Sequence, residues 1–118
     1  MARSSSWLFV IASAPYQHGL DSDPAVDITM AAGAFGQKVS VLFIGEGLGY
    51  LDPAVVPNDG ESDLRKLLKS LPLYDVDDVF IMAEGDDEKM RSFSIPAERA
   101  TADRASQLIA DADHVVSF

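Results

Sequence analysis

Three short and nearly unbroken apolar runs constrain the fold of this chain more than any other feature. They cover residues 7–12, 39–44 and 79–82, and each is rich in aromatic or β-branched side chains. Strands of this composition are typical of parallel sheets, because helices cover both faces of such a sheet. The sequence therefore predicts a central, mainly parallel sheet whose strands are buried.

Helical patterns lie between these runs. Residues 24–35 are expected to form a helix that starts at the N-cap Asp23 and ends at Gly36. This helix carries apolar side chains almost all round, so it could touch another subunit as well as the sheet. A second helix is expected to begin near Ser62, because leucines recur there at helical spacing: Leu64, Leu67, Leu68 and Leu71.

The last third of the chain contains two shorter strand patterns and one helix. Residues 93–95 are expected to form a short fourth strand, stopped by Pro96, and residues 114–118 a final strand. Thr101 is the expected N-cap of a helix between them. Its expected apolar face consists of Ala105, Leu108, Ile109 and Ala112.

Alternating strands and helices predict a three-layer α/β sandwich with a sheet of about five strands. With 118 residues, the chain is expected to form one domain over residues 1–118. In such folds, ligand sites and partner loops gather at the carboxyl ends of the strands. Those ends correspond here to residues 13–22, 45–50 and 83–88.

Composition excludes several kinds of chemistry. The chain has no cysteine, which rules out disulfides, thiolate metal sites, cysteine nucleophiles and persulfide carriage. Its formal net charge of −10 disfavours direct contact with nucleic acid. No apolar run is long enough to span a bilayer, and the run before Pro15 is too short for a signal peptide. We therefore expect a cytoplasmic protein without membrane contact.

Residue patterns that could carry catalysis or bind a cofactor are weak. The GEGLG segment at residues 45–49 lacks the spacing of a dinucleotide fingerprint and suits a tight turn. His18 and His114 are too far apart in the sequence for a metal spacing. His18 is expected to be an ordinary exposed side chain and His114 a side chain at a strand edge. Two acidic groups are interpreted as solvated turns: they comprise Asp75, Asp77 and Asp78, and Asp86, Asp87 and Glu88. We expect no catalytic, cofactor-binding or metal-binding residues.

Four stretches, taken in order, resemble one known family. They are residues 14–16 (APY), 32–47 (AGAFGQKVSVLFIGEG), 73–76 (LYDV) and 113–118 (DHVVSF). No single stretch is specific, but together they span nearly the whole chain. The pattern resembles the DsrE/DsrF/DsrH-like family, and within it the TusC/DsrF branch.

This resemblance implies a role in sulfur relay. Family complexes are heterohexamers of three related subunits, each present twice, which take persulfide sulfur from a small donor protein. In the Tus branch, the sulfur goes to the wobble uridine of certain tRNAs. The sulfur-carrying cysteine belongs to the TusD/DsrE-type subunit, at the end of its third strand, where this chain has residues 80–83 (FIMA). The resemblance therefore implies an accessory subunit that is not itself an enzyme, with TusB-like and TusD-like partners.

Partner contacts are expected in the long connection that follows the second strand. Leu48, Tyr50 and Leu51 are predicted to be interface anchors, because tyrosine and apolar side chains are common at interface centres. Two other interpretations remain open. One is a DsrF-like subunit in dissimilatory sulfur oxidation, and the other is a stand-alone flavodoxin-like module that binds a ligand at the strand ends.

Overall fold

The computed structural model describes residues 5–16, 23–57, 59–60, 63–76, 78–82, 93 and 95–118. These residues form a five-stranded sheet in the order β4-β3-β2-β1-β5, with every neighbouring pair parallel. The strand bounds are β1 Ser6–Ile11, β2 Lys38–Ile44, β3 Asp78–Met82, β4 Glu98–Arg99 and β5 His114–Ser117. The predicted parallel sheet is confirmed.

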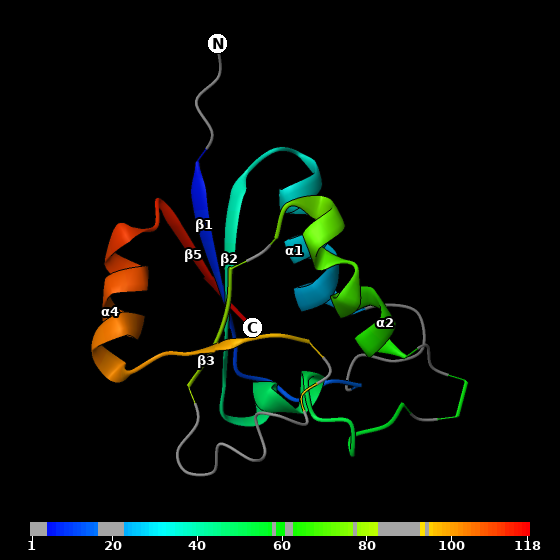
Figure 1. Ribbon diagram of the computed structural model, residues 1–118. Coiled ribbons are helices and arrows are strands. Elements are labelled where there is room, and N and C mark those ends of the chain that lie inside the picture. The colour runs from blue at the N-terminus through cyan, green and yellow to red at the C-terminus, as the bar shows by residue number, and fades with distance from the viewer. Residues whose placement is uncertain are drawn as a thin grey trace.

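Helices cover both faces of this sheet (Figure 1). Helices α1 (Pro24–Ala34) and α2 (Leu64–Lys69) lie on one face, and α4 (Ala102–Asp111) lies on the other. Two 3-10 helices, η1 (Gly45–Tyr50) and η2 (Leu71–Tyr74), follow β2 and α2. The described residues therefore build the three-layer α/β sandwich that the alternating pattern predicts.

The alternation of side chains along the strands divides the core into two parts. In β1, Phe9 and Ile11 join the larger cluster beneath α1 and α2, whereas Leu8 joins the smaller cluster beneath α4. In β2, Phe43 joins the larger cluster and Leu42 the smaller one. Successive strand residues point to opposite faces of the sheet, so a continuous apolar run fills both clusters at once.

Helix α1 begins as the sequence predicts. Asp23 is its N-cap, with one carboxylate oxygen accepting a hydrogen bond from the Val26 amide at 3.1 Å. The helix is close to η2 because Gly33 has no side chain. A Cβ atom at this position would overlap the carbonyl oxygen of Tyr74. The two segments therefore pack backbone against backbone.

The expected fourth strand is wrong in position. Phe93 and Ile95 are not in a strand, and Ser94 lies outside the described residues. Instead, β4 begins after Pro96 and pairs Glu98 with Phe80 and Arg99 with Ile81. The physical reason is that Ile95, which is 9% exposed, packs into the core cluster beneath α2.

Two helix predictions need smaller corrections. The second helix begins at Leu64 after the N-cap Asp63, and Leu71 belongs to η2 rather than to this helix. In α4, Ala105 is buried and Leu108 packs on the core, but Ile109 is 48% exposed. One apolar residue of the predicted stripe therefore stays outside the contact with the sheet.

Candidate functional site

The carboxyl ends of β1 and β2 meet at one edge of the sheet, where ligand sites of parallel α/β folds gather. Here η1 packs directly on the turn that follows β1. A Cβ atom at Gly47 would overlap the carbonyl oxygen of Ile11, and one at Gly49 would lie 3.0 Å from the Cδ atom of Pro15. The glycines of the GEGLG segment thus permit close backbone packing between two strand ends.

A buried hydrogen bond joins this edge to α1. The Tyr50 hydroxyl donates to a carboxylate oxygen of Asp23 at 2.6 Å, and both residues are buried. Burial raises the pKa of Tyr50 well above its ordinary value, and the hydrogen bond to Asp23 raises it further. The phenol therefore stays protonated, and the carboxylate serves both as acceptor for Tyr50 and as cap of α1.

Further polar contacts tie the same edge to α2. Tyr16, which has a left-handed φ of 64°, accepts a hydrogen bond from the Leu64 amide at 3.2 Å. Asp63 caps α2 through the Arg65 amide and forms an ion pair with the Arg65 guanidinium at 2.9 Å. Arg65 also donates to the carbonyl oxygen of Pro53 at 2.9 Å. Three separate segments are therefore held together around the ends of the strands.

All of these polar groups satisfy one another. Within the described ranges, no buried side-chain nitrogen or oxygen lacks a hydrogen-bond partner. A ligand site normally presents a few convergent polar groups to an open space. In the described part of this edge, the polar groups instead bond to one another, so the edge is an internally bonded structural cluster.

The end of the third strand is where the family resemblance places the sulfur-carrying position of a related subunit. Phe80 and Ile81 are buried on opposite faces of the sheet, and Met82 is half-buried. Ala83 lies outside the described residues. Benzyl, alkyl and thioether side chains cannot form a persulfide, so these three residues supply packing and no nucleophile.

The predicted interface anchors Tyr50 and Leu51 are not on the surface. They are 3% and 0% exposed, and both belong to the larger core cluster. The reason is that η1 folds back onto β2, with the Tyr50 ring centroid 5.8 Å from that of Phe43. Leu48 is half-buried and packs against the same cluster, and its contact with a partner stays a prediction.

The histidines and acidic groups are not brought together in the described structure. His114 is exposed on β5, with its ring centroid 4.3 Å from that of Trp7, and His18 lies outside the described residues. Asp75 and Asp78 are exposed; the other four predicted acidic-turn residues, Asp77, Asp86, Asp87 and Glu88, lie outside the described residues. The described residues contain no group of three or more histidines and carboxylates that could hold a metal ion.

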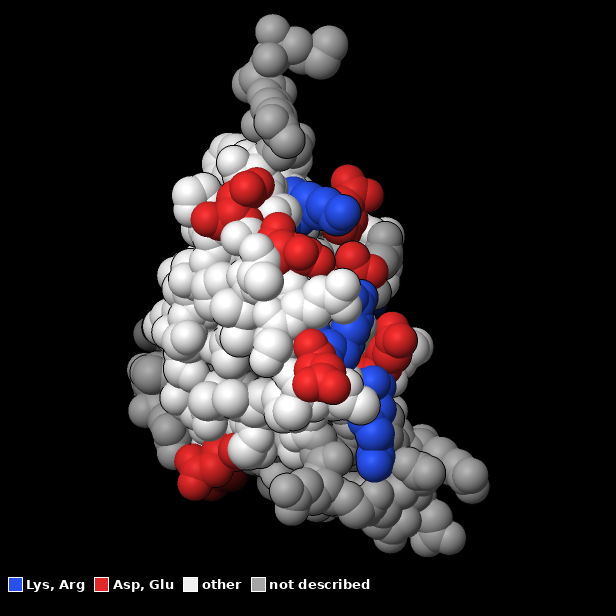
Figure 2. Space-filling model, turned by 90° about the vertical axis from the view of Figure 1, so that its left-hand side faces the viewer, with Lys and Arg blue, Asp and Glu red and all other residues white. Residues whose placement is uncertain are grey.

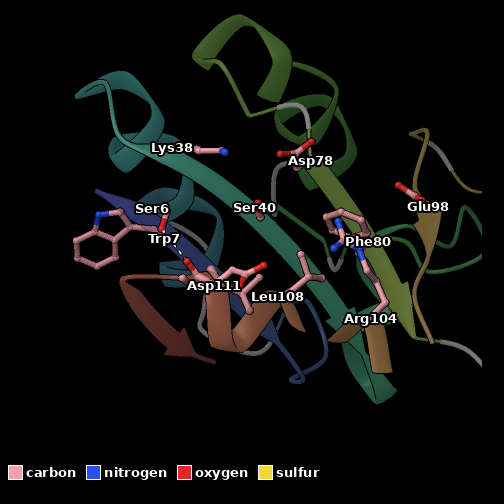
Figure 3. Close-up of a pocket in the computed structure, with 12 residues that line it drawn as sticks. Ser6, Trp7, Lys38, Ser40, Asp78, Phe80, Glu98, Arg104, Leu108 and Asp111 are labelled. Carbon is pink, nitrogen blue, oxygen red and sulfur yellow. Dashed lines mark hydrogen bonds between the residues drawn. The ribbon is translucent and has the colours of Figure 1, made fainter. Parts of the chain in front are cut away.

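A groove of about 310 Å³ lies between α4 and the sheet, near the amino ends of the central strands. Five charged side chains line it: Lys38, Asp78, Glu98, Arg104 and Asp111. Figure 3 shows Lys38 and Asp78 on one side of the groove and Leu108 and Asp111 on the other, with Ser40 between them. Arg104 lies over the Phe80 ring at 5.4 Å.

The groove belongs to the face that Figure 2 shows. Lysine, arginine and carboxylate side chains alternate along one side of that face, beside a broad area without charged residues. Such a mixture of signs gives no strong field for one kind of ion. The residues that line the groove include no sulfur nucleophile. The sequence did not predict the groove, because its lining residues come from β1, β2, β3, β4 and α4, which are far apart in the chain.

No helix of the described ranges has the length and apolar character needed to cross a bilayer.

Comparison with known proteins gives the class of this chain. The sequence model of the DsrE/DsrF-like family matches residues 5–118. A solved structure, the YchN protein from E. coli, superimposes with a TM-score of 0.73 at 16% sequence identity. The superposition covers 97% of this chain and 99% of the YchN chain, and it shows a shared fold. The chain belongs to the DsrE/DsrF-like family.

Two curated relatives narrow the comparison. A Pseudomonas aeruginosa protein named TusC homolog is 35% identical over 81 residues, which cover 68% of this chain and 67% of the relative. A Vibrio parahaemolyticus protein, also named TusC homolog, is 26% identical over 118 residues and covers 97% of this chain and 99% of its own length. These relatives support the TusC/DsrF branch of the family.

Proposed function

We propose that this chain is a non-catalytic subunit of a TusBCD-type sulfur-relay complex that supplies sulfur for wobble 2-thiouridine in tRNA. The observation that carries the proposal is that this chain, whose relatives support the TusC/DsrF branch, contains no cysteine. A relay passes sulfur from one thiolate to the next, and each station needs a thiol. The stations must then lie on other subunits.

The proposed partners are TusB-like and TusD-like subunits in a cytoplasmic heterohexamer, with a small sulfur-donor protein acting through the complex. In this assembly, residues 1–118 act as a single structural domain that helps to position the cysteine-bearing subunits and to shield their persulfides from solvent. The hydrogen bonds at the strand ends support such a role, because the Tyr50–Asp23 bond joins η1 to α1 and the Leu64–Tyr16 bond joins α2 to the turn after β1. A fixed scaffold keeps a reactive persulfide on a defined path.

A genetic experiment tests the biological destination of the sulfur. Deleting the gene in its own organism should abolish 2-thiouridine in the tRNAs that carry it, measured by mass spectrometry of digested tRNA. The wild-type gene on a plasmid should restore the modified nucleoside. Unchanged 2-thiouridine in the deletion strain would contradict the tRNA assignment, and an accompanying defect in sulfur oxidation would favour the DsrF-like alternative.

A further inference from the structure

Two large apolar side chains lie exposed on neighbouring segments of the α1–α2 face. Phe35 is 83% exposed at the end of α1, and Leu73 is 84% exposed in η2. Tyr74 and Ile28 are also exposed on the same two segments. Figure 1 shows the end of α1 beside the turn that follows α2, in agreement with the backbone contact at Gly33. We call Phe35, Leu73 and Tyr74 the α1–η2 ridge.

The fold itself holds Leu73 outside. Leu71 and Val76, on either side of it in the chain, are 1% and 0% exposed and anchor η2 in the core. Asp75 adopts a left-handed φ of 62°, and the amide of Val76 donates to the carbonyl oxygen of Leu71 at 3.1 Å. Two buried anchors and a tight turn therefore fix the η2 part of the ridge before any partner arrives, which lowers the entropic cost of binding.

The ridge differs from isolated apolar residues elsewhere on the surface. Ile109 and Val115, on α4 and β5, are 48% and 42% exposed, so about half of each is already covered. Single exposed residues of that kind are common on monomers, whereas a cluster with an aromatic and a leucine almost fully exposed marks an interaction surface. Such side chains are also typical of interface centres.

Charge indicates which kind of chain covers the ridge. The protein carries a formal net charge of −10, so two copies repel each other as they approach. A chain with a smaller negative charge is repelled less, and a chain with a positive net charge is attracted, so its encounter with this protein is favoured. The charge therefore favours a different subunit over a second copy.

We propose that the α1–η2 ridge docks an apolar surface on a less acidic, non-identical subunit of the same complex. This inference rests on the proposed function, because it takes the partner from the subunits of the relay assembly. The ridge is then the contact through which this chain joins the complex, on the face opposite the charged groove beneath α4.

The test uses the full chain co-expressed with the TusB-like and TusD-like proteins of the same genome. The variant replaces two ridge residues, Phe35→Glu and Leu73→Glu, and the matched control replaces two apolar residues of the opposite face, Ile109→Glu and Val115→Glu. Native mass spectrometry identifies the assemblies, and titration gives their dissociation constants. The ridge variant should weaken assembly at least about 100-fold, and the control less than about 3-fold.

Thermal unfolding of the isolated variants separates a lost contact from a lost fold. All four replaced side chains are exposed, so both double variants should remain folded. If the glutamate variant does not fold, Phe35→Ala with Leu73→Ala removes the same contacts without adding charge. That variant should still weaken assembly at least about 10-fold.

The outcomes distinguish the two levels of the proposal. If the wild-type chain assembles with its relatives and the ridge variants assemble equally well, the docking surface is wrong and the proposed function stands. If the control weakens assembly as much as the ridge variant, the ridge is likewise not the specific contact. Self-association of the wild-type chain that the ridge variant abolishes would make a second copy the occupant. If the wild-type chain binds neither relative, the proposed function itself fails.

Discussion

At the scale of single residues, the buried pair Asp23 and Tyr50 controls how the strand ends are held. One carboxylate caps α1 and also accepts the Tyr50 hydroxyl at 2.6 Å, so a helix start and η1 share one anchor. A charged acceptor makes this hydrogen bond stronger than a neutral one. Loss of the Tyr50 hydroxyl would leave the buried Asp23 carboxylate with one hydrogen-bond donor fewer.

Replacing Tyr50 by phenylalanine should lower the free energy of unfolding by about 1.5–3 kcal/mol, because a buried hydrogen bond to a charged group is lost. The ring keeps its packing beside Phe43, so the fold should persist. Urea denaturation measures the change. Tyr74→Phe is the matched control, since Tyr74 is 37% exposed, and it should change stability by less than about 0.5 kcal/mol. Equal effects of both variants would contradict the role of the Asp23 contact.

Asp63 gives a pH dependence with a defined sign. Hydrogen bonds from Arg65 lower the pKa of Asp63 from its ordinary value of 3.8 to about 2. Because the folded-state pKa is the lower one, the contribution of this carboxylate is complete above pH 3.8. It is lost as the pH falls towards 2.

Carbon NMR of the Asp63 carboxyl group tests this directly, with an expected titration midpoint near 2. Arg65→Met should move the midpoint back towards 3.8. Lys69→Met should leave it unchanged, because Lys69 does not contribute to the shift. A wild-type midpoint at the ordinary value would show that the ion pair does not form in solution.

At the scale of secondary-structure elements, the close contact of α1 with η2 makes glycine more favourable than alanine at position 33. Glycine inside a helix is usually less favourable than alanine by about 1 kcal/mol. At Gly33, however, a Cβ atom would overlap the carbonyl oxygen of Tyr74 and press on Val76. Gly33→Ala should therefore destabilise the protein by about 1–3 kcal/mol, as overpacking does.

Thermal denaturation of Gly33→Ala checks this prediction. The control is Ser106→Ala, which places alanine at an exposed position inside α4 and should leave stability unchanged or slightly raise it. If Gly33→Ala stabilises the protein as alanine does in an ordinary helix, the contact between α1 and η2 is looser than described.

The elements that sequence reasoning predicted well are those with local signals. Three apolar runs became β1, β2 and β3, and the N-caps Asp23 and Thr101 lie where expected. The failures depend on distant contacts. The fourth strand forms after Pro96 because Ile95 is drawn into the core, and no local pattern contains that information.

The same limit applies to the candidate site. The sequence predicts Tyr50 as an interface anchor and gives no sign of its burial, because its acceptor Asp23 is 27 residues away and the pair forms only once the chain has folded. The sequence predicts the α1 part of the α1–η2 ridge better than it predicts the burial of Tyr50. The apolar excess of residues 24–35 predicts spare apolar surface, and the structure leaves Ile28 and Phe35 exposed there.

At the scale of the whole molecule, this chain is a member of the DsrE/DsrF-like family without a thiol. Internal hydrogen bonds connect the segments at the strand ends. The side chains at the end of β3 pack in the protein core. The two most exposed large apolar side chains of the described residues, Phe35 and Leu73, lie on the α1–α2 side. These features suit a subunit that joins other chains and positions their chemistry.

Intact-protein mass spectrometry of the reconstituted complex tests the central claim most directly. The complex is loaded with sulfur from its persulfide-carrying donor protein, and each subunit is then weighed before and after treatment with a reducing agent. We expect added, reducible sulfur on a cysteine-bearing partner and none on this chain. Reducible, transferable sulfur bound to this chain would contradict the account.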